Sequence, residues 1–261
     1  RRPPRSTPAS SSAASDVYKR QAIIGPNGSG KTTLLMISAG LLKPKRGRVL
    51  LDGEPLEKQL PEARRKIGLV FQDPDDQLFN PTVYDEISFA PRQLLPSKEE
   101  VRNVVFKVAE ELGIKHLLDR PPYKLSVGEK RKVALASVLV YNPEILLLDE
   151  PTANLSASFV EELEQIIMEK RRLGKAIVVA SHDVEFIARV ADRVYVLSRG
   201  VTYGGSSARK VLTDEKLLAL ADMKPPLIHQ AAKTLGLNLR EPPLTLKELE
   251  GIARLKKGKA R

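Results

Sequence analysis

The sequence predicts an α/β fold in which a mostly parallel sheet is flanked by helices, and two observations support that prediction. Short, unbroken apolar runs such as Ile145–Leu148 have the length and composition of strands that are buried on both faces. Segments of helical periodicity, among them Ser156–Leu173 and Val184–Val190, separate these runs. Alternation at this spacing is typical of a doubly wound sheet.

The remaining elements are expected in the same alternating order. Strands are expected at Ala22–Ile24, Arg48–Leu51, Ile67–Phe71, Ala176–Ala180 and Val194–Leu197, and helices at Lys31–Leu42, Glu99–Leu112 and Glu129–Val140. Helical periodicity over residues 82–142 predicts a helical subdomain inside a main domain of residues 22–205. Residues 206–261 are expected to form a helical C-terminal segment with a basic tail, and the Pro- and Ser-rich residues 1–21 to be disordered.

Composition and charge exclude several kinds of site and partner. The chain has no cysteine, which excludes disulfides, zinc–thiolate sites and thiol catalysis. No apolar run approaches the roughly 18–20 residues that cross a bilayer. The net charge of +11 is concentrated in residues 1–21 and 252–261, so the charge pattern predicts no specific nucleic-acid partner.

A glycine-rich loop lies between the first predicted strand and the first predicted helix. Its sequence GPNGSGKT matches the phosphate-binding pattern G-x-x-x-x-G-K-[ST], in which glycines let successive N–H groups surround an anion at a helix N-terminus. Lys31 is expected to reach the β- and γ-phosphates of ATP, and Thr32 to ligate Mg²⁺. The residues assigned to ATP are Gly25, Pro26, Asn27, Gly28, Ser29, Gly30, Lys31, Thr32 and Thr33.

Two acidic residues follow the apolar run Ile145–Leu148. The end of a parallel strand is where α/β proteins bind ligands, so Asp149 is expected to hold Mg²⁺ directly or through water. Glu150, one residue later, is expected to act as a base or to orient the attacking water. The alternative is an acidic turn without function, which the phosphate loop in the same chain makes the weaker interpretation.

Further motifs, in the same order along the chain, resemble those of the ATP-binding-cassette (ABC) ATPases, a group of P-loop NTPases. Gln72 is similar to the glutamine that senses Mg²⁺ and couples to the transport partner. Leu125–Glu129 resembles the LSGGQ signature, which contacts the γ-phosphate bound by an opposite subunit. His182 resembles the switch histidine, which holds the γ-phosphate and the attacking water.

The resemblance implies a head-to-tail dimer with a second ATPase subunit, identical or different, in which each ATP site is completed by the partner's signature. The implied catalytic residues are Glu150, His182 and Gln72, the implied metal ligands are Thr32, Gln72 and Asp149, and the implied signature residues are Ser126, Val127, Gly128 and Glu129.

Two stretches, Val70–Phe79 and Thr82–Ile87, narrow the resemblance to ATPases of energy-coupling-factor importers, including cobalt and nickel uptake systems. The segment at Pro225–Pro226 is similar to that group's extra helices, which help pair the two ATPases. The resemblance implies a transmembrane coupling protein and a membrane substrate-capture subunit, for vitamins or transition-metal ions, as partners. It also implies a peripheral position on the cytoplasmic face of the cell membrane.

Several departures from the family leave other interpretations open. Val127 stands where the family has glycine, Glu129 where it has glutamine, and Ser156 where it has aspartate. These changes fit one weakened site in an asymmetric dimer, a degenerate ATP-binding protein, an ATPase of another ABC transporter class, or a soluble ABC protein. Family members also carry an adenine-stacking aromatic residue far upstream of the phosphate loop, whereas Tyr18 is too close to it. We therefore expect the true N-terminus to be truncated or replaced and residues 1–21 to be foreign.

Overall fold

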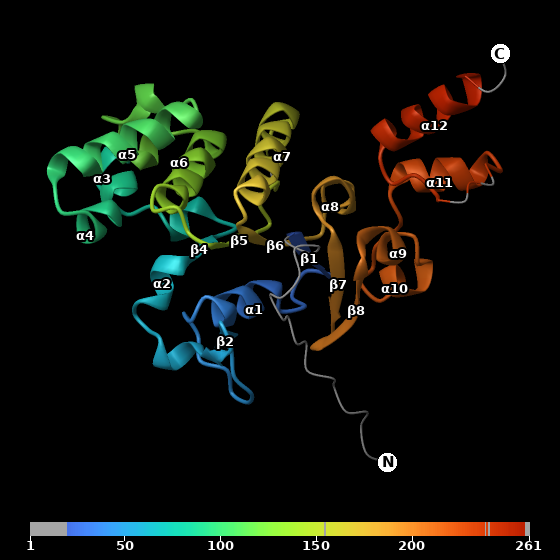
Figure 1. The fold of residues 1–261 in the computed structure, drawn as a ribbon, viewed down its shortest axis with the longest axis horizontal. Helices are drawn as coiled ribbons and strands as arrows, with labels where there is room; N and C mark the ends of the chain where they lie inside the picture. Colours follow the sequence, from blue (N-terminus) through green and yellow to red (C-terminus); the bar gives the residue numbers. More distant parts are fainter. Residues whose placement is uncertain (1–19, 154, 238, 240, 259–261) are drawn as a thin grey trace. The chain divides into compact units, whose positions relative to one another are not determined.

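The computed structural model describes residues 20–258 apart from residues 154, 238 and 240, so the expectations for residues 1–19 lie outside the described part (Figure 1). The chain divides into two compact units, one made of residues 1–31 and 181–261 and the other of residues 32–180. Parallel strands flanked by helices occur in both units, in agreement with the predicted fold class.

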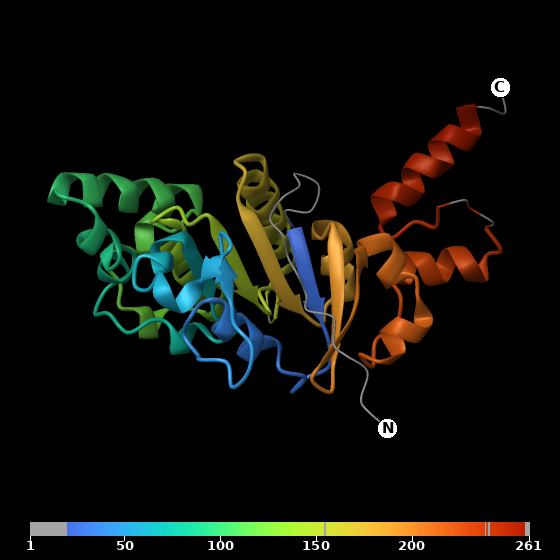
Figure 2. The same ribbon diagram turned by 60° about the horizontal axis from the view of Figure 1, so that its bottom comes forward.

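The first unit contains a short parallel pair of strands and the C-terminal helices. Its elements are β1 (Arg20–Ile24), α8 (Val184–Val190), β7 (Arg193–Ser198), β8 (Val201–Ser207), α9 (Ala208–Leu212), α10 (Glu215–Ala219), α11 (Leu227–Thr234) and α12 (Leu246–Gly258). β1 pairs in parallel with β7, and β7 pairs in antiparallel fashion with β8 (Figure 2). Ala22 and Ile24 on β1 and Val194 and Val196 on β7 are fully buried and form the centre of this unit.

Ordered structure begins earlier than the sequence predicted. β1 includes Arg20 and Gln21, which the composition placed in the disordered N-terminal segment. The side chain of Arg20 is buried and forms an ion pair with Asp192, with its Nε 3.0 Å from Oδ2. The Asp192 N–H donates to the Arg20 carbonyl at 2.9 Å. A paired arginine thus starts a strand at a position where its charge suggested exposed chain.

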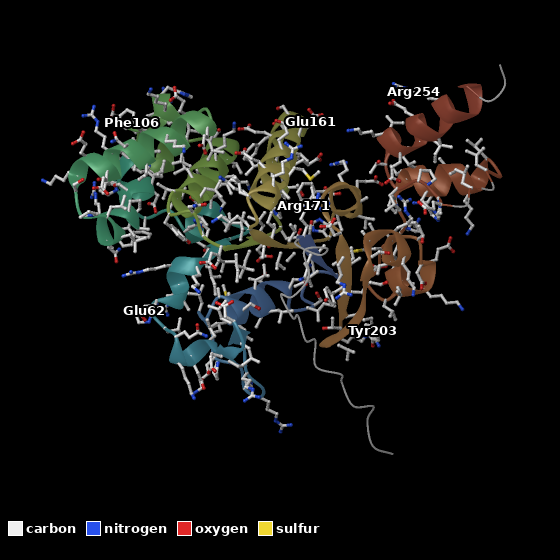
Figure 3. All side chains as sticks on the ribbon, in the orientation of Figure 1. Glu62, Phe106, Glu161, Arg171, Tyr203 and Arg254 are labelled. Carbon is white, nitrogen blue, oxygen red and sulfur yellow. The ribbon has the colours of Figure 1, made fainter. Side chains whose placement is uncertain are left out.

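β8 is a strand that the sequence analysis did not predict. Its sequence VTYGGSS contains two glycines with positive φ, and most of its residues are exposed. Tyr203, labelled in Figure 3, is 38% exposed on this strand. Because the strand has no buried apolar face, neither an apolar run nor a clean alternation marks it.

The second unit contains the other parallel strands. Its elements outside the helical part are α1 (Lys31–Ser38), β2 (Leu50–Leu51), β3 (Glu54–Pro55), η1 (Leu56–Lys58), α2 (Ala63–Lys66), β4 (Ile67–Val70), η2 (Pro74–Asp76), β5 (Ile145–Asp149), α7 (Ala157–Arg172) and β6 (Ala176–Ser181). β5 pairs in parallel with β4 on one side and with β6 on the other. Leu146, Leu147 and Leu148 on β5 are almost fully buried, as expected for a strand covered on both faces.

Helices and 3₁₀ turns occupy the chain between η2 and β5, where every residue is described and none forms a strand. They are α3 (Val83–Ser88), α4 (Pro91–Leu94), α5 (Lys98–Glu111), η3 (Lys115–Leu117), η4 (Pro122–Lys124) and α6 (Val127–Leu139). Val83, Ile87, Val105 and Val133 are fully buried. The boundaries of the predicted helical subdomain, about 82–142, stay a prediction.

The helix after the phosphate loop is shorter than expected. α1 ends at Ser38, whereas the apolar pattern suggested Leu42. Gly40 has a φ of +71°, and the Leu41 N–H donates to the Met36 carbonyl at 2.9 Å. A left-handed glycine closed by such a bond is a common helix end, so Gly40 stops the helix before Pro44 is reached.

Gly68 on β4 offers a test of packing in the second unit. A Cβ at this position would lie 2.9 Å from the Pro143 side chain and closer still to that of Val138. We expect Gly68→Ala to lower the free energy of unfolding by about 1–3 kcal/mol, because a well-packed core resists an added methyl group. The matched control is Gly251→Ala on α12, where a Cβ would meet nothing within 4 Å and helix propensity favours alanine. Denaturant unfolding that shows equal losses for both variants would contradict this account of β4.

Candidate functional site

The phosphate loop leads from β1 into α1. Gly28 and Gly30 have φ angles of +76° and +98°, so both occupy backbone conformations that glycine adopts without strain. A Cβ on Gly25 would clash with the Leu197 carbonyl and lie 2.8 Å from Ser29 Oγ. The Lys31 side chain is buried, and its Nζ donates to the carbonyls of Gly25 and Pro26 at 2.8 and 3.3 Å. The loop therefore wraps around its own lysine and places a positive charge at its centre.

An open cavity of about 540 Å³ adjoins the outer part of the loop within the first unit. It is lined by residues of the loop, of the β7–β8 turn and of the segment after α10: Pro26, Asn27, Gly28, Ser29, Ser198, Arg199, Gly200, Ala219, Leu220 and Asp222. This volume lies within the range of small-molecule sites. The lining brings one cation and one carboxylate together with apolar side chains beside the predicted phosphate-binding residues.

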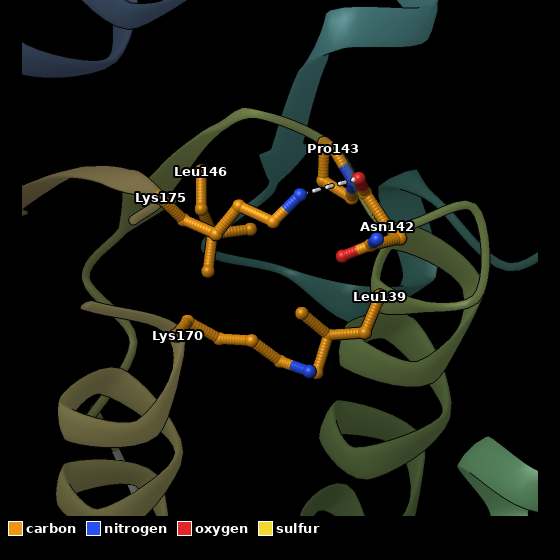
Figure 4. A pocket seen from close by; sticks show the side chains of 6 residues that line it. All are labelled: Leu139, Asn142, Pro143, Leu146, Lys170 and Lys175. Carbon is orange, nitrogen blue, oxygen red and sulfur yellow. Dashed lines mark hydrogen bonds between the residues drawn. The ribbon is translucent and has the colours of Figure 1, made fainter. Parts of the chain in front are cut away.

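A second cavity, in the other unit, has a volume of only about 10 Å³. Its lining is shown in Figure 4 and comprises Leu139, Asn142, Pro143, Leu146, Lys170 and Lys175. Lys175 Nζ donates to the Asn142 carbonyl at 3.0 Å. A space of this size holds about one water molecule, so this cavity carries no ligand-binding argument.

The acidic pair lies at the end of β5, as the sequence predicted. Asp149 and Glu150 are both buried, with 1% and 3% of their surface exposed. Glu150 has a φ of +43°, an uncommon left-handed conformation for a residue with a side chain. Its N–H donates to the Ala180 carbonyl at 2.8 Å, which fixes the turn against the end of β6. The backbone reverses between the two residues, so their side chains leave the strand end differently.

Arg131 on α6 is a residue that the sequence analysis missed. Its guanidinium donates to the Glu150 carbonyl at 3.1 Å and thereby joins the helix of the signature to the acidic turn. Burial lowers the pKa of this guanidinium from its usual value, while Asp73 and Glu150 act in the opposite direction. The available signal was its place on the helix, one turn after Val127 and Gly128, where a side chain lies on the same face.

The signature opens α6 in the second unit. Ser126 is the N-cap: the Glu129 N–H donates to Ser126 Oγ, and the Ser126 N–H donates to the Glu129 carboxylate at 2.8 Å. The Val127 side chain is 53% exposed, and a Cβ on Gly128 would meet nothing within 4 Å. A capping box of this kind leaves the first helical N–H groups directed outward.

The other predicted residues occupy loops and helix ends. His182 is exposed between Ser181 and Asp183, and the Asp183 carboxylate caps α8 by accepting from the Phe186 N–H at 2.9 Å. Gln72 is exposed after β4, and Thr32 and Thr33 lie in the first turn of α1. Gly25–Lys31 and His182 belong to the first unit, whereas Thr32, Thr33, Gln72, the signature, Asp149 and Glu150 belong to the second.

The donor set in the second unit is suited to a hard cation. Asp149 offers a carboxylate, Thr32 a hydroxyl and Gln72 an amide oxygen. Within the described residues no cluster of three or more His, Cys, Asp or Glu side chains could hold a metal. Mg²⁺ is commonly bound by one or two protein oxygens together with substrate phosphates and waters, so these residues fit it.

Comparison with known proteins decides the family. The profile of the family described as ABC transporter matches residues 16–153, which is more than half of the chain. A cobalt import ATP-binding protein of Rhodobacter capsulatus is 44% identical over 214 residues, which cover 81% of this chain and 76% of that protein. The chain belongs to the ABC transporter family. It is an ATP-binding ATPase subunit of that family.

Other ABC relatives agree with this assignment. The energy-coupling factor transporter ATP-binding protein EcfA of Methanothermobacter thermautotrophicus is 40% identical over 211 residues, covering 80% of this chain and 68% of that protein. The solved structure of cbiO1 from Clostridium perfringens, described as part of the ABC transporter complex cbiONQ, superposes with a TM-score of 0.68 at 34% identity. That match covers 84% of this chain and 88% of the other. The predicted fold class and family are thereby confirmed.

Proposed function

We infer that this ABC subunit hydrolyses ATP with the residues at the phosphate loop and at the end of β5, and that it powers an importer of the energy-coupling-factor type. The observation that carries the proposal is the buried pair Asp149 and Glu150, with Glu150 held at a φ of +43° directly after the strand. A buried turn that keeps a strained carboxylate needs a reason other than stability.

The roles follow from the chemistry of each group. The N–H groups of Gly28 and Gly30 and the ammonium of Lys31 bind the phosphates, because together they present a concentrated positive potential. Glu150 accepts a proton from, or orients, the attacking water, and His182 donates a hydrogen bond that holds the γ-phosphate. Arg131 fixes the Glu150 backbone through its carbonyl.

Mg²⁺ is the cofactor that these residues would hold. Thr32, Gln72 and Asp149 are the proposed ligands, and the ion, when bound, would neutralise charge on the phosphate oxygens. Their oxygen-only chemistry supports the assignment. Chelation with EDTA is the corresponding removal experiment for hydrolysis.

The signature in the second unit supports a head-to-tail dimer. Ser126 and the N–H groups at the start of α6 form an anion-binding end that a second subunit's nucleotide would complete. ATP would then join two subunits, and hydrolysis would release them.

This arrangement predicts that ATPase activity depends on protein concentration. Specific activity is expected to rise several-fold as the chain is taken from nanomolar to micromolar concentration, because each site needs the signature of a second subunit. The measurement is phosphate release per subunit, with sedimentation velocity on the same samples. Full specific activity in a sample that sediments as a monomer would contradict the dimer.

The transport role is proposed from the relatives. The Rhodobacter capsulatus protein is named for cobalt import, and the Methanothermobacter thermautotrophicus protein for an energy-coupling factor transporter. By analogy we infer a transmembrane coupling protein and a substrate-capture subunit for a transition-metal ion or a vitamin as partners. None of the described helices is long and apolar enough to cross a bilayer, which supports a peripheral position on the cytoplasmic face of the membrane.

A further inference from the structure

The signature of this chain contains a carboxylate that is bound directly to the signature serine. Ser126 Oγ donates to Glu129 Oε2 at 2.7 Å, and the Ser126 N–H donates to the same oxygen at 2.8 Å. The Glu129 N–H in turn donates to Ser126 Oγ at 3.3 Å. The hydroxyl proton of Ser126 is therefore already used within the loop.

The same carboxylate also changes the charge at the start of α6. The pKa of Glu129 is lowered, first by the hydrogen bonds from Ser126 and then by the nearby cations of Arg120 and His116, so the group is ionised at neutral pH. A negative charge there complements the positive end of the helix dipole. An arriving triphosphate would have to share that helix end with it.

We propose that Glu129 is a positioning residue that weakens the ATP-driven contact between two subunits by holding the Ser126 hydroxyl and occupying the N-terminus of α6. This inference rests on the proposed function, because the contact that it weakens is the one between the signature and a second subunit's γ-phosphate. To donate to a phosphate, Ser126 must break a charge-assisted hydrogen bond, and the carboxylate charge then remains nearby. Glutamine at this position would keep the N-cap acceptor and remove the charge.

The chain offers a matched control on α5. Ser97 caps that helix by accepting from the Glu100 N–H at 3.1 Å, and its hydroxyl donates to the Glu100 carboxylate at 3.1 Å. Glu100→Gln therefore removes the same charge from the same kind of capping interaction, at a helix start outside the proposed site.

The experiment measures ATP-dependent self-association. Glu129→Gln and Glu100→Gln are each combined with Glu150→Gln, which is expected to prevent hydrolysis, and the molar mass is followed by sedimentation velocity at fixed ATP and Mg²⁺. A charge at a helix end is worth about a two- to fivefold change in binding, and a symmetric dimer contains two such contacts. The Glu129→Gln chain should therefore associate about four- to 25-fold more tightly, whereas Glu100→Gln should not change the association.

A second readout separates charge from structure. The gain from Glu129→Gln should shrink as NaCl is raised from 50 to 500 mM, because salt screens an exposed charge. Loss of a purely structural cap would instead weaken association and lower the thermal midpoint. If Glu129→Gln associates no more tightly than the Glu150→Gln parent, the role of Glu129 is wrong while the dimer stands. If the parent itself fails to associate on adding ATP, the proposed self-dimer is overturned and the inference with it.

Discussion

Replacement of Glu150 by glutamine is expected to reduce ATP hydrolysis by about 10²–10⁴-fold while ATP affinity stays unchanged. Glutamine has almost the same shape and can still hydrogen-bond, but it cannot accept the proton of the attacking water. The assay is single-turnover phosphate release at saturating ATP, with nucleotide affinity measured by calorimetry on the same protein.

The backbone makes this variant a clean test. Glutamine at position 150 would retain the φ of +43° and its strain, so the free energy of unfolding should be the same in both proteins. The N–H bond to the Ala180 carbonyl and the bond from Arg131 involve only the main chain of residue 150. Hydrolysis that persists at the original rate would overturn the role of Glu150. A parent protein that binds ATP without hydrolysing it would favour the degenerate ABC interpretation.

Replacement of Lys31 by methionine is expected to weaken ATP binding by about 30-fold or more. Loss of one partner from a buried, charged interaction costs about 2–5 kcal/mol, and the Lys31 ammonium lies at the centre of the phosphate loop. Methionine keeps most of the side-chain length and removes only the charge and its donors. Calorimetric titration with ATP and Mg²⁺ measures the change.

Lys175 supplies the matched control for this variant. Its Nζ also donates to a backbone carbonyl, that of Asn142 at 3.0 Å, beside the cavity of about 10 Å³ shown in Figure 4. Lys175→Met should therefore alter stability slightly and ATP affinity not at all. Equal ATP affinities for the Lys31 and Lys175 variants would show that the loop lysine does not bind the phosphates.

The parts of the fold that the sequence predicted are those governed by buried apolar runs. β5 and β6 were placed within one residue at each end because their side chains are buried and their ends are marked by polar residues. β8 was missed because its residues are exposed and include two left-handed glycines. β1 was started too late because the ion pair of Arg20 with Asp192 joins residues far apart in the chain.

The candidate site shows the same division between local and distant information. The phosphate loop is a contiguous motif whose glycines and lysine each have a local reason, so its position was readable from spacing. The contact of Arg131 with Glu150 joins α6 to the end of β5, and no local pattern announces it. The left-handed backbone of Glu150 is equally hidden, because glutamate gives no indication that it will adopt a glycine-like angle.

That angle at Glu150 sets two kinds of selection against each other. A left-handed conformation costs a residue with a Cβ about 1–2 kcal/mol relative to glycine, and this cost is present in every folded molecule whether or not nucleotide is bound. A library selected for heat tolerance alone should therefore drift toward glycine at position 150, whereas one selected for ATP turnover should retain the carboxylate. The two selections would leave different residues at one position of an otherwise similar fold.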